Sequence, residues 1–315
     1  MIHTPPGGAG EATIVESWRC RARDRRARVV LADGRDARAV AAAERLDAEG
    51  LVTPVLMDNP DDFRSDAVCS RAETAPFRER IDLDDPLHVA ALMVVAGEAD
   101  ACVAGATRPT PDVVRAALFC IGLAPGVDIV SSCFLLVLPD GAPVTYGDCG
   151  VVPEPDAAQL ASIAVSTAAT HAELTGDEPR VAMLSYSTKG SAAGPRVELV
   201  REATEIVRSR APSLAVDGEL QFDAAWVPEV AGSKAPGSPV AGRANVFVFP
   251  DLSSGNIAYK ITQRLGGARA YGPLLQGAAA VIHDLSRGCD ATDIANVALI
   301  AACQSARRRS QPPEA

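Results

Sequence analysis

The densest group of residues that could carry out chemistry lies in the segment HDLSRGCDATDIANVA, residues 283–298. Ser286 and Arg287 stand just before a helical pattern whose first turn would contain Asp293. This combination suits a phosphate group, because a planar guanidinium makes paired hydrogen bonds while backbone N–H groups at a helix start point at the anion. The segment therefore predicts a site for an anionic ligand.

Three further polar groups follow expected strands, at the positions where an open α/β sheet binds its ligands. In DGRDARAV, Arg35 and Arg38 lie at the start of a helix and predict a second anion contact. In GATRPTPDVVRAAL, Arg115 lies about one helical turn after Asp112. The segment LSYSTKGSAAGPR forms a polar loop after a strand, and its candidate binding residues are Ser187, Thr188, Lys189 and Gly190.

Each of these groups also has a plainer structural interpretation. Asp290 or Thr292 would simply cap the helix that follows the Ser-Arg-Gly tripeptide, and Arg287 would cover the surface. Arg38 would be solvated, and Arg115 would form an ion pair with Asp112. The serine-rich loop would be an ordinary turn.

The elements that must position these residues alternate along the chain. Apolar runs predict strands over residues 28–32, 54–57 and 101–106, and helical periodicity predicts helices over 36–50, 85–100 and 111–123. This order is typical of a parallel sheet covered on both faces. Residues 127–151 predict two strands joined at Asp140-Gly141.

Further along, strands are expected over 180–187 and 244–251, the second as a central parallel strand. Helices are expected over 156–174, 195–210, 257–266 and 291–303. The fold class is therefore α/β with two domains. Residues 1–127 with 277–315 form the first, to which the last helix returns, and residues 128–276 form the second.

Composition limits the classes of function. The chain has 315 residues, 48% hydrophobic and 22% charged, which is ordinary globular composition. It has no apolar run of about 18 residues and no signal-peptide pattern, so we expect a soluble, cytoplasmic protein without membrane contact. Its eight cysteines lack metal-ligand spacing, which predicts reduced thiols and no metal site.

The net charge of −10 argues against a nucleic-acid partner. The arginines between Arg19 and Arg28 are instead expected on a solvated helix face, with Trp18 buried beneath them. The motifs GxGxxG, GxxxxGK[ST], HExxH and GxSxG are missing from their expected positions, which disfavours dinucleotide, ATP, zinc-protease and lipase-like functions.

Several longer blocks resemble one family. VAGATRPTPDVVRAAL, RVAMLSYSTKGSAAGPRVE, DGELQFDAA, FPDLSSGNIAYK and HDLSRGCDATDI are similar to the signature blocks of the phosphate acetyl/butyryltransferase family, and the resemblance runs from about Arg28 to Gln304. It implies two α/β domains of the isocitrate/isopropylmalate dehydrogenase-like architecture, a cleft between them and a homodimer. It also implies the reaction acetyl phosphate + CoA ⇌ acetyl-CoA + phosphate, with coenzyme A as a co-substrate and no permanently bound cofactor.

Residue by residue, the resemblance gives catalytic roles to Ser286, Arg287 and Asp293, and substrate-binding roles to Arg38 and Arg115. Asp293 would take the proton of the CoA thiol. An ordinary carboxylate, with a pKa of about 3.9, is a weak base for a thiol of pKa about 8.5, so a raised carboxylate pKa or a cation beside the thiolate would be needed.

In the same scheme Arg287 and Arg115 would hold the phosphoryl oxygens, and Ser286 would donate to the developing oxyanion. Cys289 is the alternative nucleophile, but no covalent acyl-enzyme is implied. The family has one further arginine, and either Arg78 or Arg80 is the candidate for its counterpart in this chain.

The chain departs from the family pattern in places. It has Arg108 where a histidine is usual, Val152 in place of an asparagine, Ala280 in place of a lysine and His283 in place of an asparagine. Two alternatives therefore stay open. One is a phosphate butyryltransferase or other short-chain acyltransferase, and the other is a weakly catalytic paralogue that binds CoA or acyl phosphate.

Overall fold

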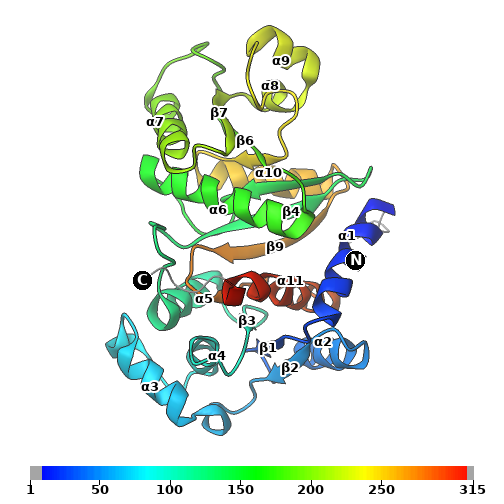
Figure 1. Cartoon of the computed structure of the whole chain (residues 1–315), viewed down its shortest axis with the longest axis vertical. Coiled ribbons are helices and arrows are strands. Elements are labelled where there is room, and N and C mark those ends of the chain that lie inside the picture. Colours follow the sequence, from blue (N-terminus) through cyan, green and yellow to red (C-terminus); the bar gives the residue numbers. More distant parts are fainter. Residues whose placement is uncertain (1–8, 311–315) are drawn as a thin grey trace. The chain divides into compact units, whose positions relative to one another are not determined.

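The computed structural model describes residues 9–310, and its internal contacts divide the chain into two compact units (Figure 1). We call residues 12–130 with 271–310 the terminal unit, and residues 131–270 with 9–11 the middle unit. The outer ends of the predicted first domain, residues 1–8 and 311–315, lie outside the described residues.

The terminal unit is built on a parallel four-stranded sheet in the order β10-β3-β1-β2. Its strands are β1 (Arg28–Leu31), β2 (Thr53–Leu56), β3 (Ala101–Val103) and β10 (Val281–His283). Its helices are α2 (Ala37–Ala48), α3 (Asp66–Thr74), α4 (Pro86–Val95), α5 (Thr110–Ala116), α11 (Ala291–Ser310) and most of α1 (Ala9–Arg23). Shorter helical turns are η1 (Pro60–Phe63), η2 (Arg78–Arg80) and the π-helical η3 (Ala117–Ile121).

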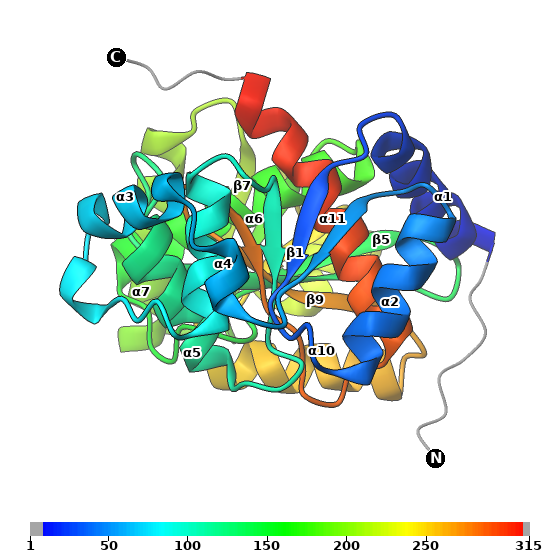
Figure 2. The ribbon, with the colours of Figure 1, turned by 90° about the horizontal axis from the view of Figure 1, so that it is seen from below.

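Helices cover both faces of this sheet, as the alternating pattern predicted. Figure 2 shows α2 and α11 on one side of β1 and α4 and α5 on the other. Helix α4 is apolar on nearly all sides because it is packed between α3, α5 and the sheet, and it begins with Pro86 after the capping residue Asp85.

Two predictions in the terminal unit were wrong in detail. No strand was predicted after residue 251, but the segment 278–283 contains β10, which pairs with β3 from Val281 to His283. The helix expected over 111–123 ends as α5 at Ala116 and continues as the wider η3. A strand of three residues, of which only Val281 and Ile282 are apolar, is too short to be distinguished from a loop in the sequence.

The middle unit contains a mixed sheet in the order β7-β6-β8-β5-β4-β9. Its strands are β4 (Ser131–Val137), β5 (Pro143–Gly147), β6 (Arg180–Leu184), β7 (Ala215–Leu220), β8 (Val246–Val248) and β9 (Arg269–Gln276), the last of which continues into the terminal unit. Its helices are α6 (Ala157–Thr175), α7 (Pro195–Arg210), α8 (Phe222–Trp226), α9 (Pro228–Lys234) and α10 (Leu252–Arg264).

The hairpin and the central strand of this sheet were predicted correctly. Strands β4 and β5 are antiparallel around Asp140-Gly141, and β8 lies parallel between β5 and β6. Alternation along β5 assigns its two faces: Thr145 contacts His171 of α6, whereas Tyr146 contacts Thr262 of α10. Helices α6 and α10 therefore cover opposite faces of the middle sheet.

The basic N-terminal stretch follows its prediction in part, since α1 ends at Arg23 and the arginines from Arg25 to Arg28 lie in the turn before β1 and at its first residue. Trp18 is fully buried against the ring of Tyr271, edge to face at 5.1 Å. Arg19 forms an ion pair with Glu49, so this part of α1 packs on the terminal unit. Among the described residues, no helix combines the length and apolar character that crossing a membrane requires.

Candidate functional site

The carboxyl ends of β1, β3 and β10 meet at one edge of the terminal sheet. Ala32 N–H donates to the carbonyl of Val103 at 2.9 Å, and Ala104 N–H donates to the carbonyl of His283 at 3.0 Å. The connections from β1 and from β3 leave in opposite directions along the strand order, so this edge is a topological switch point. Such crevices are where open α/β sheets bind ligands.

The Ser286–Arg287 loop follows β10 at this edge. Both residues are exposed, and Ser286 Oγ accepts a hydrogen bond from the N–H of Gly288 at 3.3 Å. Within residues 9–310, the guanidinium of Arg287 has neither an ion pair nor a hydrogen bond. The loop therefore presents an unpaired cation beside a hydroxyl group.

Asp293 lies at the start of α11 in a reciprocal cap. Its N–H donates to Asp290 Oδ1 at 2.9 Å, and its own Oδ2 accepts from the N–H of Asp290 at 3.1 Å. The capping interpretation of Asp290 is thus correct. Asp293 is nevertheless exposed, so its carboxylate lies within reach of a ligand in solution.

Arg38 lies in the first turn of α2 and reaches across to the same loop. Its Nη1 atom donates to the carbonyl oxygens of Arg287 and Cys289, both at 2.9 Å. Its Nε and Nη2 atoms donate to the carboxylate of Asp36, at 2.9 and 2.8 Å. Nη2 also donates to the carbonyl of Ala106 at 2.8 Å, so Arg38 touches the chain after β1, β3 and β10.

Arg115 on α5 forms the ion pair with Asp112 that the sequence offered as the plainer interpretation. The arginine side chain is 54% exposed. Exposed ion pairs of this spacing on a helix contribute about 0.2–0.5 kcal/mol. A phosphate group could displace Asp112 at little cost.

Cys289 is poorly suited to act as a nucleophile. Its side chain is buried, and burial raises the pKa of the thiol to about 11, although the nearby Arg38 opposes the shift. A thiol with this pKa is almost entirely protonated at neutral pH. This agrees with a mechanism that has no acyl-enzyme.

A buried carboxyl group, Asp284, lies between β10 and this loop and was not predicted as a site residue. It accepts a hydrogen bond from Thr110 Oγ1 at 2.5 Å, which connects the end of β10 to the start of α5. Burial raises the pKa of Asp284 to about 7. Gly105 passes so close that a Cβ atom there would lie 2.1 Å from Asp284 Oδ1.

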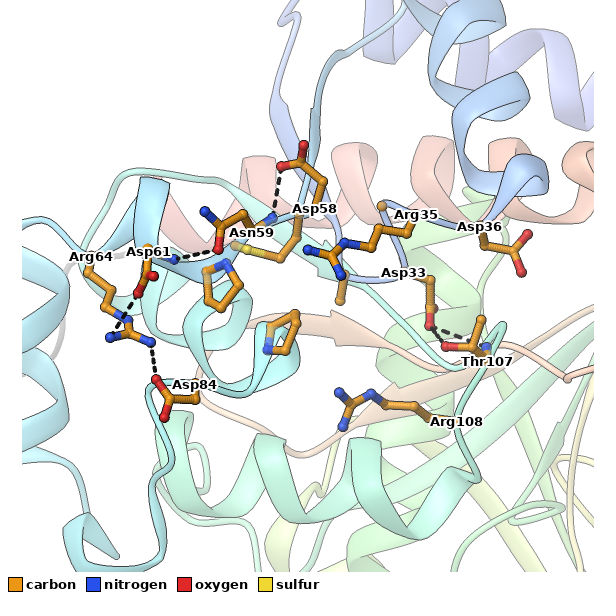
Figure 3. Close-up of a pocket in the computed structure, with 15 residues that line it drawn as sticks. Asp33, Arg35, Asp36, Asp58, Asn59, Asp61, Arg64, Asp84, Thr107 and Arg108 are labelled. Carbon is orange, nitrogen blue, oxygen red and sulfur yellow. Dashed lines mark hydrogen bonds and ion pairs between the residues drawn. The ribbon is translucent and has the colours of Figure 1, made fainter.

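A pocket of about 520 Å³ opens beside the ends of β1 and β2 (Figure 3). Arg35 and Arg108 extend into it, and Asp33 binds the backbone N–H groups of Ala106 and Thr107. The lining carries five aspartates against three arginines, so it does not form a simple anion site. Arg35, one of the two arginines predicted to contact an anion, lines this pocket, but the predicted catalytic residues do not.

The predicted loop of the middle unit, Ser187 to Gly190, is held by two buried carboxylates. Glu219 accepts from Ser187 Oγ at 2.8 Å and from the N–H of Gly190 at 2.9 Å, while Asp217 pairs with Lys189. Thr188 Oγ1 contacts Gln221. The loop is therefore a fixed structure and not an ordinary flexible turn.

Glu219 is itself charged in the folded state. Burial alone would raise the pKa of this carboxyl group, but Arg201 binds both of its oxygens and, with the N–H of Gly190, lowers the pKa to about 2. Its neighbour Asp217 also accepts from Arg208 at 2.8 Å. Asp217 and Glu219 were not predicted as functional residues. Their segment, DGEL, contributed to the sequence analysis only through the family resemblance.

A model of the family described as Phosphate acetyl/butaryl transferase matches residues 67–302. The chain belongs to this family. Phosphate acetyltransferases from Acetivibrio thermocellus and Paracoccus denitrificans are 43% and 46% identical to it, over 88% of this chain in each case and 93% and 94% of theirs. A phosphotransacetylase structure from Streptococcus pyogenes is 40% identical, with a TM-score of 0.86 over 94% of this chain and 99% of that one.

Family membership confirms the resemblance drawn from the signature blocks and makes the chain an acyltransferase with a parallel-rich α/β fold. The terminal unit brings Arg38 to the Ser286–Arg287 loop, and it places Asp293 on the helix that follows. Ser187 to Gly190 belong to the middle unit. The dehydrogenase-like architecture and the cleft between domains stay predictions.

Proposed function

We propose that the chain catalyses the reversible transfer of an acetyl group between acetyl phosphate and coenzyme A. The observation that carries the proposal is the exposed Ser286–Arg287 loop, with its unpaired guanidinium, at the switch point of a parallel sheet. Relatives that are 43% and 46% identical and named phosphate acetyltransferase support the choice of reaction. Coenzyme A is a co-substrate that leaves after each turnover, and the proposal assigns no resident cofactor or metal ion.

In the proposed step, the CoA sulfur attacks the acyl carbon, a C–S bond forms, and the C–O bond to phosphate breaks. The leaving phosphate keeps the electron pair, and Asp293 accepts the thiol proton. Arg287 stabilises both the thiolate and the leaving phosphate, because a guanidinium binds oxyanions through two parallel N–H groups. Ser286 donates to the oxygen that becomes negative as the bond forms.

Arg115 and the loop from Ser187 to Gly190 bind substrate in this proposal. Arg115 leaves Asp112 and binds a phosphoryl group instead. This exchange costs little because the exposed ion pair with Asp112 contributes only a small free energy. Ser187, Thr188, Lys189 and Gly190 contact coenzyme A. Their support is the rigid loop held by Glu219 and Asp217, since a fixed loop loses little entropy on binding.

We also propose a cytoplasmic homodimer without nucleic-acid or membrane partners. Helix α10 and its first following residue carry an apolar stripe at a spacing of four residues, formed by Ile257, Ile261 and Leu265. These side chains are 59%, 52% and 86% exposed. A helical stripe can pack against the same stripe of a second copy across a two-fold axis, which removes all three side chains from water.

The decisive experiment measures acetyl-CoA formation from acetyl phosphate and CoA with purified protein. We expect turnover that falls by about 10² or more in Arg287→Ala, whereas Arg45→Ala, an exposed arginine of α2, leaves it unchanged. Faster turnover with butyryl phosphate would favour the butyryltransferase alternative. Binding of CoA by calorimetry without turnover would overturn the proposal in favour of a weakly catalytic paralogue.

A further inference from the structure

We infer that Arg38 is a positioning residue, which holds the Ser286–Arg287 loop in place instead of binding substrate itself. A guanidinium has five N–H donors and no acceptor. In this structure the oxygen acceptors around Arg38 match that number: the two oxygens of Asp36 and the carbonyl oxygens of Ala106, Arg287 and Cys289. A phosphate group would have to displace protein acceptors from Arg38.

The orientation of Arg38 is fixed from its other side. Asp36 is the N-cap of α2 and accepts from the backbone N–H of Arg38 as well as from its side chain. The fork-to-fork ion pair raises the pKa of Arg38 and lowers that of Asp36. One carboxylate therefore caps the helix and sets the direction of the guanidinium.

These contacts fix the backbone of Arg287. Arg38 binds the carbonyl oxygen of Arg287 and leaves the Arg287 side chain without a partner among the described residues. Two residues further on, the carbonyl of Cys289 is held as well, directly before the cap of α11. The backbone on both sides of Gly288 is thus fixed, and the catalytic guanidinium projects from a rigid loop.

Cys289 provides a reporter of this contact that does not depend on turnover. Its side chain is 7% exposed, and its sulfur lies 3.9 Å from Arg38 Nη1. If Arg38 holds the loop, Arg38→Ala should increase the alkylation rate of Cys289 by about ten-fold or more, because the loop opens locally. Cys102 and Cys303, buried in the same unit, should keep their protection.

The experiment combines alkylation followed by mass spectrometry with steady-state kinetics on Arg38→Ala, Arg38→Lys and Asp36→Asn, with Arg45→Ala as control. We expect kcat to fall by roughly 10² in Arg38→Ala while the KM values for CoA and acetyl phosphate change by less than about three-fold. Guanidinium ion at millimolar concentration should restore part of kcat. Asp36→Asn should show a smaller effect of the same kind.

The kinetic arm rests on the proposed function, and the alkylation arm does not. A ten-fold rise in either KM with Cys289 still protected would overturn the inference and make Arg38 a substrate ligand. Unchanged alkylation of Cys289 in both Arg38→Ala and Arg38→Lys would also overturn it. If Arg38→Ala exposes Cys102 and Cys303 too, Arg38→Lys and Asp36→Asn decide the question, because both keep a polar group in place.

Discussion

At the scale of single residues, Asp293 has two uses that compete for one carboxylate. One oxygen accepts a hydrogen bond from the N–H of Asp290 and so caps α11. In the proposed reaction, the same carboxylate also accepts a proton from the CoA thiol. A carboxamide at this position keeps the oxygen that caps the helix and removes the basicity. Capping and catalysis can therefore be separated by a single substitution.

We expect Asp293→Asn to lower kcat by about 10² or more while the affinity for CoA changes little. The measurement is steady-state turnover together with calorimetric titration of CoA. Asp290→Asn serves as the matched control, because it alters the same cap and leaves the Asp293 carboxylate chemically unchanged. Near-normal turnover in Asp293→Asn would remove Asp293 from the mechanism.

Asp284 should make stability depend on pH. Its pKa rises from 3.8 in the unfolded chain to about 7 in the folded protein because of burial. A group with a raised folded pKa contributes stability fully below its unfolded pKa, and this contribution is lost as pH rises from about 4 through 7. The loss amounts to roughly 4 kcal/mol at most.

We expect Asp284→Asn to reduce that loss, measured as the free energy of unfolding from urea titrations between pH 4 and 8. Glu44→Gln, an exposed carboxylate of α2 in the same unit, should leave the pH dependence unchanged. The same slope in the wild type and in Asp284→Asn would show that Asp284 does not titrate in this range.

Residue types and spacing marked Ser286, Arg287 and Asp293 as candidates for an anion site, but only the family resemblance gave them catalytic roles, because polar residues before a helix also serve as caps. They could not show that Arg38 is occupied by backbone carbonyl groups, because a carbonyl acceptor has no signature in the sequence. Glu219 and Asp284 were missed for a related reason. Their importance comes from burial, which depends on chain segments far away in sequence.

At the scale of elements, Gly105 allows β3 and β10 to end side by side. It has a φ of +100°, and a Cβ atom there would meet Asp284 Oδ1 at 2.1 Å and the backbone nitrogen of Leu285 at 2.8 Å. Gly97, in the same unit, has a φ of +77° but open space around it. A side chain at Gly97 would therefore meet backbone strain alone, whereas a side chain at Gly105 would meet both backbone strain and a steric clash.

We expect Gly97→Ala to cost about 1 kcal/mol through its positive φ, and Gly105→Ala to cost about 3 kcal/mol or more because the strand ends must also move apart. Thermal unfolding of the two variants provides the comparison. Equal losses would mean that the end of β10 shifts freely, in which case Asp284 could not fix the start of α5.

The long and strongly periodic elements, such as α6 and α7, were predicted from the sequence nearly to the residue, and so was the β4–β5 hairpin. Strand β10 and helices α8 and α9 were not predicted, because they have too few residues for a period to repeat. Strand β7 was missed because Asp217, Gly218 and Glu219 interrupt its apolar pattern. The start of α10 was placed too late, because the SSGN segment resembles a loop although Asp251 caps it into the helix.

At the scale of the whole molecule, the proposed homodimer can be tested at the α10 stripe. We expect the protein to have twice the chain mass of 32.7 kDa by light scattering, and the double variant Ile261→Asp/Leu265→Asp to have the single-chain mass, because two charges cannot be buried unpaired at an interface. Lys260→Asp, on the same helix but beside the stripe, is the control. A double variant of unchanged mass would place the dimer interface elsewhere, and a wild type of single-chain mass would contradict the homodimer itself.

The two tryptophans of the chain fall in different units, and this gives each unit its own optical signal. Trp18, in the terminal unit, is fully buried, and Trp226, in the middle unit, is 37% exposed. Emission from Trp18 should lie at shorter wavelength and resist quenching by iodide, whereas emission from Trp226 should be shifted to the red and quenched. With Trp226→Phe and Trp18→Phe as single-reporter variants, the unfolding of each unit and its response to coenzyme A can be followed without any attached label.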